Sequence, residues 1–372
     1  EGPAETLRLV SVALQAWANR GVDDVTQHIV VLANLTPDRV VDEGLAGMLL
    51  KKTPFTPDEV TALIGQAERL DFEVLYAPGV TGSQASPVAE FVLAADRDAF
   101  IDSYPVDISP ATDNRPFFFS VVRLGDLGND EFARSAIYGF GAEATRTLIL
   151  TLIISVALAA LLIVLPLALG RGGALRQPGG GAYIAYYALL GLGFILVEIP
   201  MLQKMSIYLG SPTYALVVIL FSLLFFSGIG SLLSQRTALV RILPDLRLTI
   251  AALLALILVY ALALPEVLRA TQGLPLAARA LLVVAMLAPA GLLMGRPFPM
   301  GLRHVEAAGV GKLMPWLWAA NGTLSVVGSV TATIMAINLG FAAVFTAGAL
   351  AYALALLATA GFGRIYSEKP AS

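Results

Sequence analysis

Apolar positions in the first third of the chain recur at the spacings of short helices and strands. A first helix is predicted by inward-facing positions at helical spacing, which are Leu7, Val10, Leu14 and Trp17. His28 to Ala33 then forms a short apolar run typical of a strand, and a further apolar run covers Leu45 to Leu50. Residues 1–120 therefore indicate a mixed α/β segment.

The best-specified element of this segment is a helix that begins after Thr56. Thr56 predicts an N-cap, Pro57 suits the first turn, and Glu59 completes a capping box. The expected inner face consists of Val60, Leu63, Ile64, Ala67 and Leu70. A strand over 73–76 follows, so helix then strand, twice over, resembles the late units of a doubly wound, Rossmann-like sheet.

The glycine-rich turn of a nucleotide-binding sheet is missing from this segment. No GxGxxG occurs before residue 140. The nearest match, Gly79 to Ser83, follows a late strand and is interpreted as a loop. Residues 121–146 are polar and contain glycine, which indicates a linker or an interfacial helix.

From Thr147 the pattern changes to long apolar runs separated by short polar loops, and each run is long enough to cross about 30 Å of hydrocarbon. The runs predict seven spans, near 147–169, 182–203, 212–234, 247–265, 278–300, 315–337 and 340–363. Pro and Gly in the fifth and sixth spans are expected to interrupt them. Small residues at helical spacing predict close packing: Gly191 and Gly193, Ser227 with Ser231, Ser325 with Ser329, and Ala347 with Ala351. Residues 147–372 are therefore expected to form an all-α transmembrane domain.

Composition supports this division and excludes several classes of site. The chain is 57% hydrophobic and 14% charged, so lipid is its expected partner over most of its length. The net charge is −3 with no basic block, so a nucleic-acid partner is not expected. Cysteine is absent and only two histidines occur, so thiolate chemistry is excluded and no metal centre is expected.

Lysine and arginine in the loops predict the orientation in the membrane. One side holds the larger group: Arg171, Arg176, Arg236, Arg241, Arg247, Arg303, Lys312, Arg364 and Lys369. The other side holds Lys204, Arg269 and Arg279, with Arg134 and Arg146 before the first span. The richer side is expected to be cytoplasmic, which with seven spans places the soluble segment outside; one miscounted span reverses this.

Two charged residues of the predicted membrane domain are candidate site residues. Glu198 lies within an apolar run, where a carboxylate is costly; it is either a structural tie to Lys204 or Arg296, which we favour, or an ion or substrate ligand. Arg296 lies in a segment with two prolines and two glycines that predicts a helix break. It either reaches the membrane surface from a helix end, the commoner case, or binds an anionic group or lipid headgroup. Asn321 is expected to bond a neighbouring helix.

The densest polar stretch of the soluble segment is DISPATDNRPFFF, which begins at Asp107. Asp113 and Arg115 are bracketed by turn residues and followed by three phenylalanines. We favour a loop pinned by an ion pair, with the phenylalanines docked into a core or a membrane surface. No histidine, cysteine or second close carboxylate completes a catalytic set.

That stretch, preceded by KKTPFTPDEV and followed by YYALLGLGFILVEIPMLQK, LGSPTYALVVILFSLLFFSGIGSLLS, GRPFPMGLR and WAANGTLSVVGSV, resembles the C-terminal portion of bacterial membrane-bound spermidine synthase-like proteins. The resemblance covers nearly the whole chain. It implies the tail of an aminopropyltransferase or methyltransferase-type domain joined to membrane helices in the bacterial inner membrane. Segments for an S-adenosylmethionine-type cofactor and the catalytic acid are expected upstream of Glu1, so no catalytic residue is assigned. Asp107, Asp113, Arg115 and Glu198 are family-pattern positions of unknown role.

Three functions follow as hypotheses. In the first hypothesis the full protein is a transferase that moves an aminopropyl or methyl group, and this chain supplies part of its fold and holds it in the membrane. Alternatively, the helices form a transporter-like or channel-like bundle around Glu198. In the third hypothesis the chain is a non-catalytic accessory subunit that docks other membrane subunits. The first is our expectation, with the accessory subunit close behind.

Overall fold

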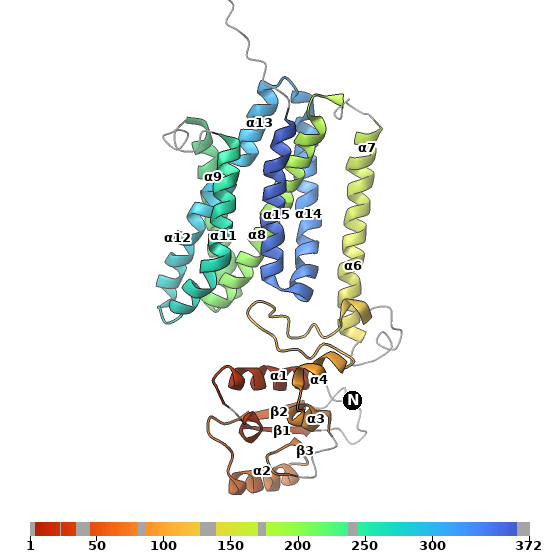
Figure 1. Cartoon of the computed structure of the whole chain (residues 1–372), viewed down its shortest axis with the longest axis vertical. Coiled ribbons are helices and arrows are strands. Elements are labelled where there is room, and N and C mark those ends of the chain that lie inside the picture. Colours follow the sequence, from red (N-terminus) through yellow and green to blue (C-terminus); the bar gives the residue numbers. More distant parts are fainter. Residues whose placement is uncertain are drawn as a thin grey trace, which may run out of the picture. The chain divides into compact units, whose positions relative to one another are not determined.

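A computed structural model describes residues 4–22, 24–34, 45–80, 86–126, 139–169, 176–236 and 245–362. The chain divides into two compact units, Glu1–Thr147 and Leu148–Ser372 (Figure 1). Residues 127–138 of the expected linker over 121–146 lie outside the described residues, as do Thr81 to Ser83 of the expected loop. The described part of the expected linker from Gly139 onward belongs to a helix that continues to Ala159.

The first unit contains a small antiparallel sheet. Its strands are β1 (Ile29–Asn34), β2 (Leu45–Leu50) and β3 (Glu73–Tyr76), in the order β2-β1-β3. Strand β1 pairs antiparallel with both neighbours, and a register shift interrupts its pairing with β3 after Val31. The Rossmann-like interpretation is therefore not confirmed, since a doubly wound sheet requires parallel neighbours and the described strands have none. Both apolar runs form strands as predicted; Ile29, Val30 and Val31 give β1 the β-branched composition that favours a strand, whereas β2 has no β-branched residue.

Helices cover both faces of this sheet. The helices of the unit are α1 (Ala4–Ala18), α2 (Pro57–Arg69), α3 (Pro87–Leu93) and α4 (Arg97–Ser103), with single 3-10 turns over Val25–His28 and Leu124–Asp126. Alternation along β1 sends Ile29 and Val31 into one core with α1 and α3, and Val30 into a second core with α2. The segment is a three-layer sandwich, and its expected α/β character is confirmed at this coarser level.

Most of the helix predictions in this unit are confirmed. Leu7, Val10 and Leu14 are buried on the inner face of α1, and Trp17 is half-buried. The capping box of α2 is formed: the Glu59 amide donates to the Thr56 hydroxyl, and the Thr56 amide donates to the Glu59 carboxylate at 2.8 Å. The inner face of α2 ends earlier than predicted, because Leu70 follows the last helical residue and is 62% exposed.

Within the described residues, seven helices are long and apolar enough to cross a membrane, as predicted. They are built from α6 (Gly139–Ala159) continuing through a π-helical turn (Ala160–Val164) into α7 (Leu165–Ala168), α8 (Gly180–Leu209), α9 (Pro212–Arg236), α11 (Leu246–Ala270), α12 (Leu276–Met294) with α13 (Pro297–Ala307), α14 (Met314–Leu339) and α15 (Phe341–Ala358). Short 3-10 turns cover Gly311–Leu313 and Thr359–Gly361. The chain is thus a multi-pass membrane protein.

Helix α8 is at the centre of the bundle and packs against α14, α15 and α9 (Figure 1). Small residues bring the helices together, as predicted from their spacing. A Cβ added at Gly191 would lie 2.1 Å from the Asn321 carbonyl oxygen on α14, and one at Gly295 would lie 2.1 Å from the Ser227 carbonyl oxygen on α9. Backbones in such contact tolerate no side chain, so these glycines fix the helix spacing.

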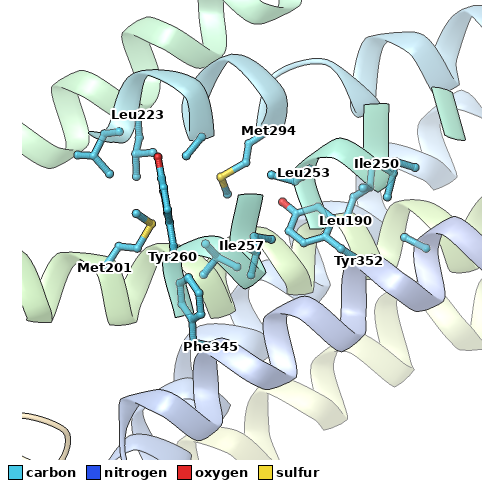
Figure 2. Close-up of a cluster of buried hydrophobic side chains, with 14 of the residues drawn as sticks. Leu190, Met201, Leu223, Ile250, Leu253, Ile257, Tyr260, Met294, Phe345 and Tyr352 are labelled. Atoms are coloured by element: carbon cyan, nitrogen blue, oxygen red, sulfur yellow. The ribbon is translucent and has the colours of Figure 1, made fainter. Parts of the chain in front are cut away.

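The apolar core between these helices is continuous. Figure 2 shows Tyr260 beside Met201 and Phe345, and Tyr352 beside Leu190. A long apolar helix can bury only one face in such a core, and the outward faces keep large apolar residues, for example Leu262 at 81% exposure. These faces are suited to hydrocarbon rather than water.

The fifth span is interrupted and the sixth is not. Helix α12 ends at Met294, and α13 begins at Pro297, so Gly295 and Arg296 form the break. Pro297 and Pro299 lack amide hydrogens, which favours a helix start at this point. Helix α14 runs without interruption through Asn321 and Gly322, so the expectation of a break there is wrong. The side chain of Asn321 donates a hydrogen bond to a neighbouring helix and does not compete for the backbone hydrogen bonds of α14, which explains part of the difference from the prediction.

Candidate functional site

The charged centre of the first unit is formed by Asp107 and two arginines. One carboxylate oxygen of Asp107 pairs with Arg8 at 3.1 Å and with Arg115. The other oxygen accepts hydrogen bonds from the amide of Ser109 at 3.0 Å and from its hydroxyl at 2.5 Å. The carboxylate is thus fully engaged, and Asp107 is only 7% exposed.

Arg8 connects this carboxylate to the rest of the polar loop. Its Nη1 donates to the carbonyl oxygens of Phe117, Phe118 and Ser120, at 3.0, 2.8 and 2.8 Å. The guanidinium lies on α1 and is 2% exposed, so a single side chain ties the first helix to a segment more than 100 residues later. A planar group with five donors suits this role.

Opposing effects set the pKa of Asp107. Burial raises the pKa of its carboxyl, but the Ser109 hydroxyl and amide, followed by Arg115 and Arg8, outweigh burial and hold it below its usual value. Burial also lowers the pKa of Arg8, and Asp107 offsets that effect only in part. Both groups are charged at neutral pH, because the pKa of Asp107 is below its usual value and arginine does not lose its proton in proteins.

This cluster, which we call the Asp107 pin, resembles the predicted pinned loop with different partners. Arg115 pairs with Asp107, whereas Asp113 is exposed. Arg8 was not predicted from the sequence. The available indication was a charged residue next to the inward-facing apolar positions of the first helix. Of the three phenylalanines, Phe119 is 76% exposed, and the other two are half-buried. A carboxylate held by two arginines is poorly suited to proton transfer, since its proton affinity and its oxygens are already committed.

Glu198 is the corresponding carboxylate of the membrane unit, and its surroundings differ. Helix α8 has 30 residues, so at about 1.5 Å per residue Glu198 lies about 5 Å from its midpoint along the axis. That depth is within the hydrocarbon layer of a bilayer about 30 Å thick. Glu198 is half-buried, and among the described residues it has no ion pair. The favoured structural tie to Lys204 or Arg296 is therefore not found there.

Helix α14 supplies a polar neighbour to the face that carries Glu198. Seven residues are almost two turns, so Glu198 lies on the same face of α8 as Gly191, which packs against Asn321 and Ser325. Further along α14, the side chains of Ser329, Thr331, Thr333 and Asn338 bond to carbonyls of their own helix, and their spacing distributes them over several of its faces. A hydroxyl that donates in this way still has acceptor lone pairs for a cation.

Asn321 behaves as predicted from sequence. Its Nδ2 donates to the carbonyl oxygen of Tyr187 on α8 at 3.0 Å, and its own carbonyl accepts from the Ser325 hydroxyl at 2.9 Å. This bond between α14 and α8 gives the amide a partner in an apolar environment. The prediction that Asn321 bonds a neighbouring helix is therefore confirmed.

The helix break around Arg296 is held by tyrosines that sequence analysis did not single out. Tyr186 and Tyr187 of α8 donate to the carbonyl oxygens of Pro297 and Phe298, at 2.9 and 3.0 Å, and Tyr183 bonds to His304 at 2.9 Å. These rings are fully buried. The buried hydroxyls of the YIAYY stretch of α8 are therefore satisfied by the start of α13 and by His304, and these three polar groups in an apolar run were the available signal.

Arg296 is covered by protein and does not extend into lipid. It is 2% exposed, although a snorkelling arginine at a helix end would be expected to reach the interface. Gly295 beside it packs closely against the α9 backbone at Ser227. A lipid headgroup therefore has poor access to Arg296.

Among the described residues, no group of three or more His, Asp or Glu is placed to hold a metal ion. The strongest candidate site is consequently the α8–α14 face with Glu198. No family model, curated protein or solved structure matches the chain.

Proposed function

We propose that this chain belongs to an integral membrane, spermidine synthase-like protein whose helical bundle binds a polyamine-type cation at Glu198. The observation that carries the proposal is a carboxylate near the middle of α8 that has no ion pair among the described residues. A charged group at this depth is costly unless it is neutralised by a proton or a cation. A protonated amine that binds here removes this cost.

The lack of a group of three His, Asp or Glu among the described residues favours an amine over a bare metal ion as the ligand of Glu198. An ammonium group retains hydrogen-bond donors and fits a site with one carboxylate and a few neutral acceptors. The resemblance adds the chemical class, because aminopropyl transfer forms polyamines.

Binding of radiolabelled spermidine to the full chain in lipid nanodiscs tests the proposal. Glu198→Gln keeps the shape and removes the charge, so affinity is expected to fall by about tenfold or more, on the scale of a desolvated charge pair. The matched control is Glu266→Gln, at an exposed carboxylate paired with Arg269 on α11, which is expected to bind spermidine as the wild type does. Equal binding by wild type and Glu198→Gln would remove the proposal.

Transferase activity is the second candidate and is supported by the resemblance. Thermal-shift measurement with S-adenosylmethionine and its decarboxylated form tests it directly, because a ligand that binds the folded state raises the melting temperature. This result is independent of Glu198.

An accessory role, in which the chain docks other membrane subunits, is the third candidate. Blue-native electrophoresis of the membrane extract tests whether the chain is part of a larger complex. A single band at the mass of the monomer would contradict an accessory subunit.

A further inference from the structure

A groove lies on the bundle surface where α11 begins and α15 ends. Its volume is about 550 Å³, and its lining includes Asp245, Arg247, Leu248, Ala251, Leu357 and Thr359. We call it the α11–α15 groove. It is separate from Glu198, so the inference below does not depend on the proposed function.

The walls of the groove are apolar and open outward. Leu248 is 45% exposed and Leu357 is 68% exposed, while Ala251 leaves space one turn further along α11. In a membrane-spanning bundle such walls are covered by acyl chains rather than water. The groove can therefore hold one chain of a lipid.

The polar end of the groove holds one cation in a fixed position. Arg247 donates from Nε to the Thr359 hydroxyl at 3.0 Å and from Nη2 to the Thr359 carbonyl at 3.1 Å. These two bonds hold the guanidinium at the end of α15. Its Nη1 forms no hydrogen bond with the described residues, so it can donate to an outside group.

An anion lies beside this cation. Asp245 is the N-cap residue of α11, and its backbone carbonyl accepts from Thr249, yet its side chain makes no capping bond. The carboxylate is exposed and lines the groove. Within the described part of the chain, Asp245 and Arg247 form no ion pair with one another. The groove thus presents both signs of charge at the end of two membrane helices, which is the depth of lipid headgroups.

We propose that the α11–α15 groove binds a phospholipid with a primary-amine headgroup, of the phosphatidylethanolamine class. Its phosphate accepts from Arg247, its ammonium donates to Asp245, and one acyl chain lies along Leu248, Ala251 and Leu357. Charge complementarity selects this class among membrane lipids. Phosphatidylcholine has no N–H to donate to the carboxylate, and phosphatidylglycerol has no cation for it.

Native mass spectrometry of the delipidated full chain, titrated separately with the three lipids, tests the proposal. Phosphatidylethanolamine is expected to bind about three- to tenfold more tightly than phosphatidylcholine, on the scale of charge-assisted hydrogen bonds at a partly exposed site. Asp245→Asn is expected to remove this preference. The same variant is expected to leave phosphatidylglycerol binding unchanged or stronger, because it removes a repelling charge.

Filling the groove provides a second test that does not depend on charge. Ala251→Trp occupies the acyl-chain path and is expected to weaken binding of phosphatidylethanolamine, whereas Leu281→Trp, at an exposed position of α12 that does not line the groove, is the matched control. Equal affinity for ethanolamine and choline lipids would overturn the proposal. So would stronger binding of phosphatidylglycerol than of phosphatidylethanolamine by the wild type, or equal losses in the two tryptophan variants.

Discussion

The two units each contain a carboxylate away from bulk water, and the two carboxylates are treated differently. Asp107 has two arginines and a serine around it, and Arg8 in turn satisfies three backbone carbonyls. Glu198 lies near the middle of a membrane helix with no ion pair among the described residues. The first carboxylate is compensated inside the fold, whereas the second has no cation from the described residues beside it.

This contrast separates structure from function in physical terms. A buried ion pair with satisfied hydrogen bonds holds chain segments together, and removal of one partner leaves a buried charge. A carboxylate in hydrocarbon without a protein cation stabilises nothing by itself and is kept at a cost in folding free energy. We therefore interpret the Asp107 pin as structural and Glu198 as the residue to test for ligand binding.

Removal of the pin is expected to have the largest effect. Asp107→Ala leaves Arg8 buried without its anion, and the first unit is expected to lose about 3–5 kcal/mol of unfolding free energy. Trp17 is the only tryptophan outside the membrane unit, so its fluorescence in a Trp316→Phe, Trp318→Phe background follows this unit during denaturation. Asp113→Ala is the control, and its expected change is within about 0.5 kcal/mol because the side chain is exposed. Similar losses in both variants would contradict the structural role of the pin.

The membrane unit is expected to respond most to a change in helix spacing. Gly191→Ala drives a methyl group into the Asn321 carbonyl on α14, at a cost of about 1–3 kcal/mol. Gly322→Ala, at the next residue of α14, meets no atom within 4 Å and is the matched control. Unfolding in mixed detergent micelles measures both. If Gly191→Ala were as stable as the control, the close α8–α14 contact that carries Glu198 would be in doubt.

The pin also predicts the acid sensitivity of the first unit. The pKa of Asp107 is lower in the folded unit than in the unfolded chain, so its contribution is fully present above the unfolded pKa and is lost as pH falls through the folded pKa. Below about pH 4, the loss of this contribution is expected to lower the unfolding free energy of the first unit by at most about 1.4 kcal/mol per pH unit. Trp17-detected denaturation between pH 5 and pH 2, compared with Asp107→Asn, measures it. An equally steep acid loss in the variant would assign the sensitivity to other carboxylates.

The smallest expected effect concerns the neutral polar groups of the bundle. Tyr187→Phe removes one hydrogen bond to the Phe298 carbonyl and is expected to cost about 0.5–1.5 kcal/mol. Phe298 packs against Trp318 at 4.5 Å, so the fluorescence of Trp318 is expected to report the change. Tyr214→Phe, at an exposed ring on α9, serves as the control. No difference between the two variants would show that the tyrosines do not hold the helix break.

Local patterns predicted the helices well and the pairing of distant residues poorly. Apolar run length was sufficient for seven spans, because a chain in hydrocarbon must satisfy its backbone within each helix. The capping box at Thr56 was also predictable, since both partners lie within three residues. Sheet direction was not, because a run such as Ile29–Asn34 has the same composition whichever way its neighbours run.

The candidate sites show the same division. Glu198 was found from sequence because one carboxylate in an apolar run is a local signal. Its surroundings were not, since they depend on which helix lies beside α8. The partner of Arg115 was misassigned to nearby Asp113, and Arg8 was missed because the pin joins segments 99 residues apart. Ion pairs between distant segments leave no periodic trace in a single sequence.

The contrast between the two carboxylates is tested most directly by the shift that spermidine causes in the melting temperature of the membrane unit, followed by Trp316 and Trp318 in a Trp17→Phe background. Because a ligand that binds only the folded state stabilises it, spermidine is expected to raise this temperature in the wild type and in Asp107→Asn, and to leave it unchanged in Glu198→Gln. An equal shift in Glu198→Gln, or no shift in the wild type, would contradict the account.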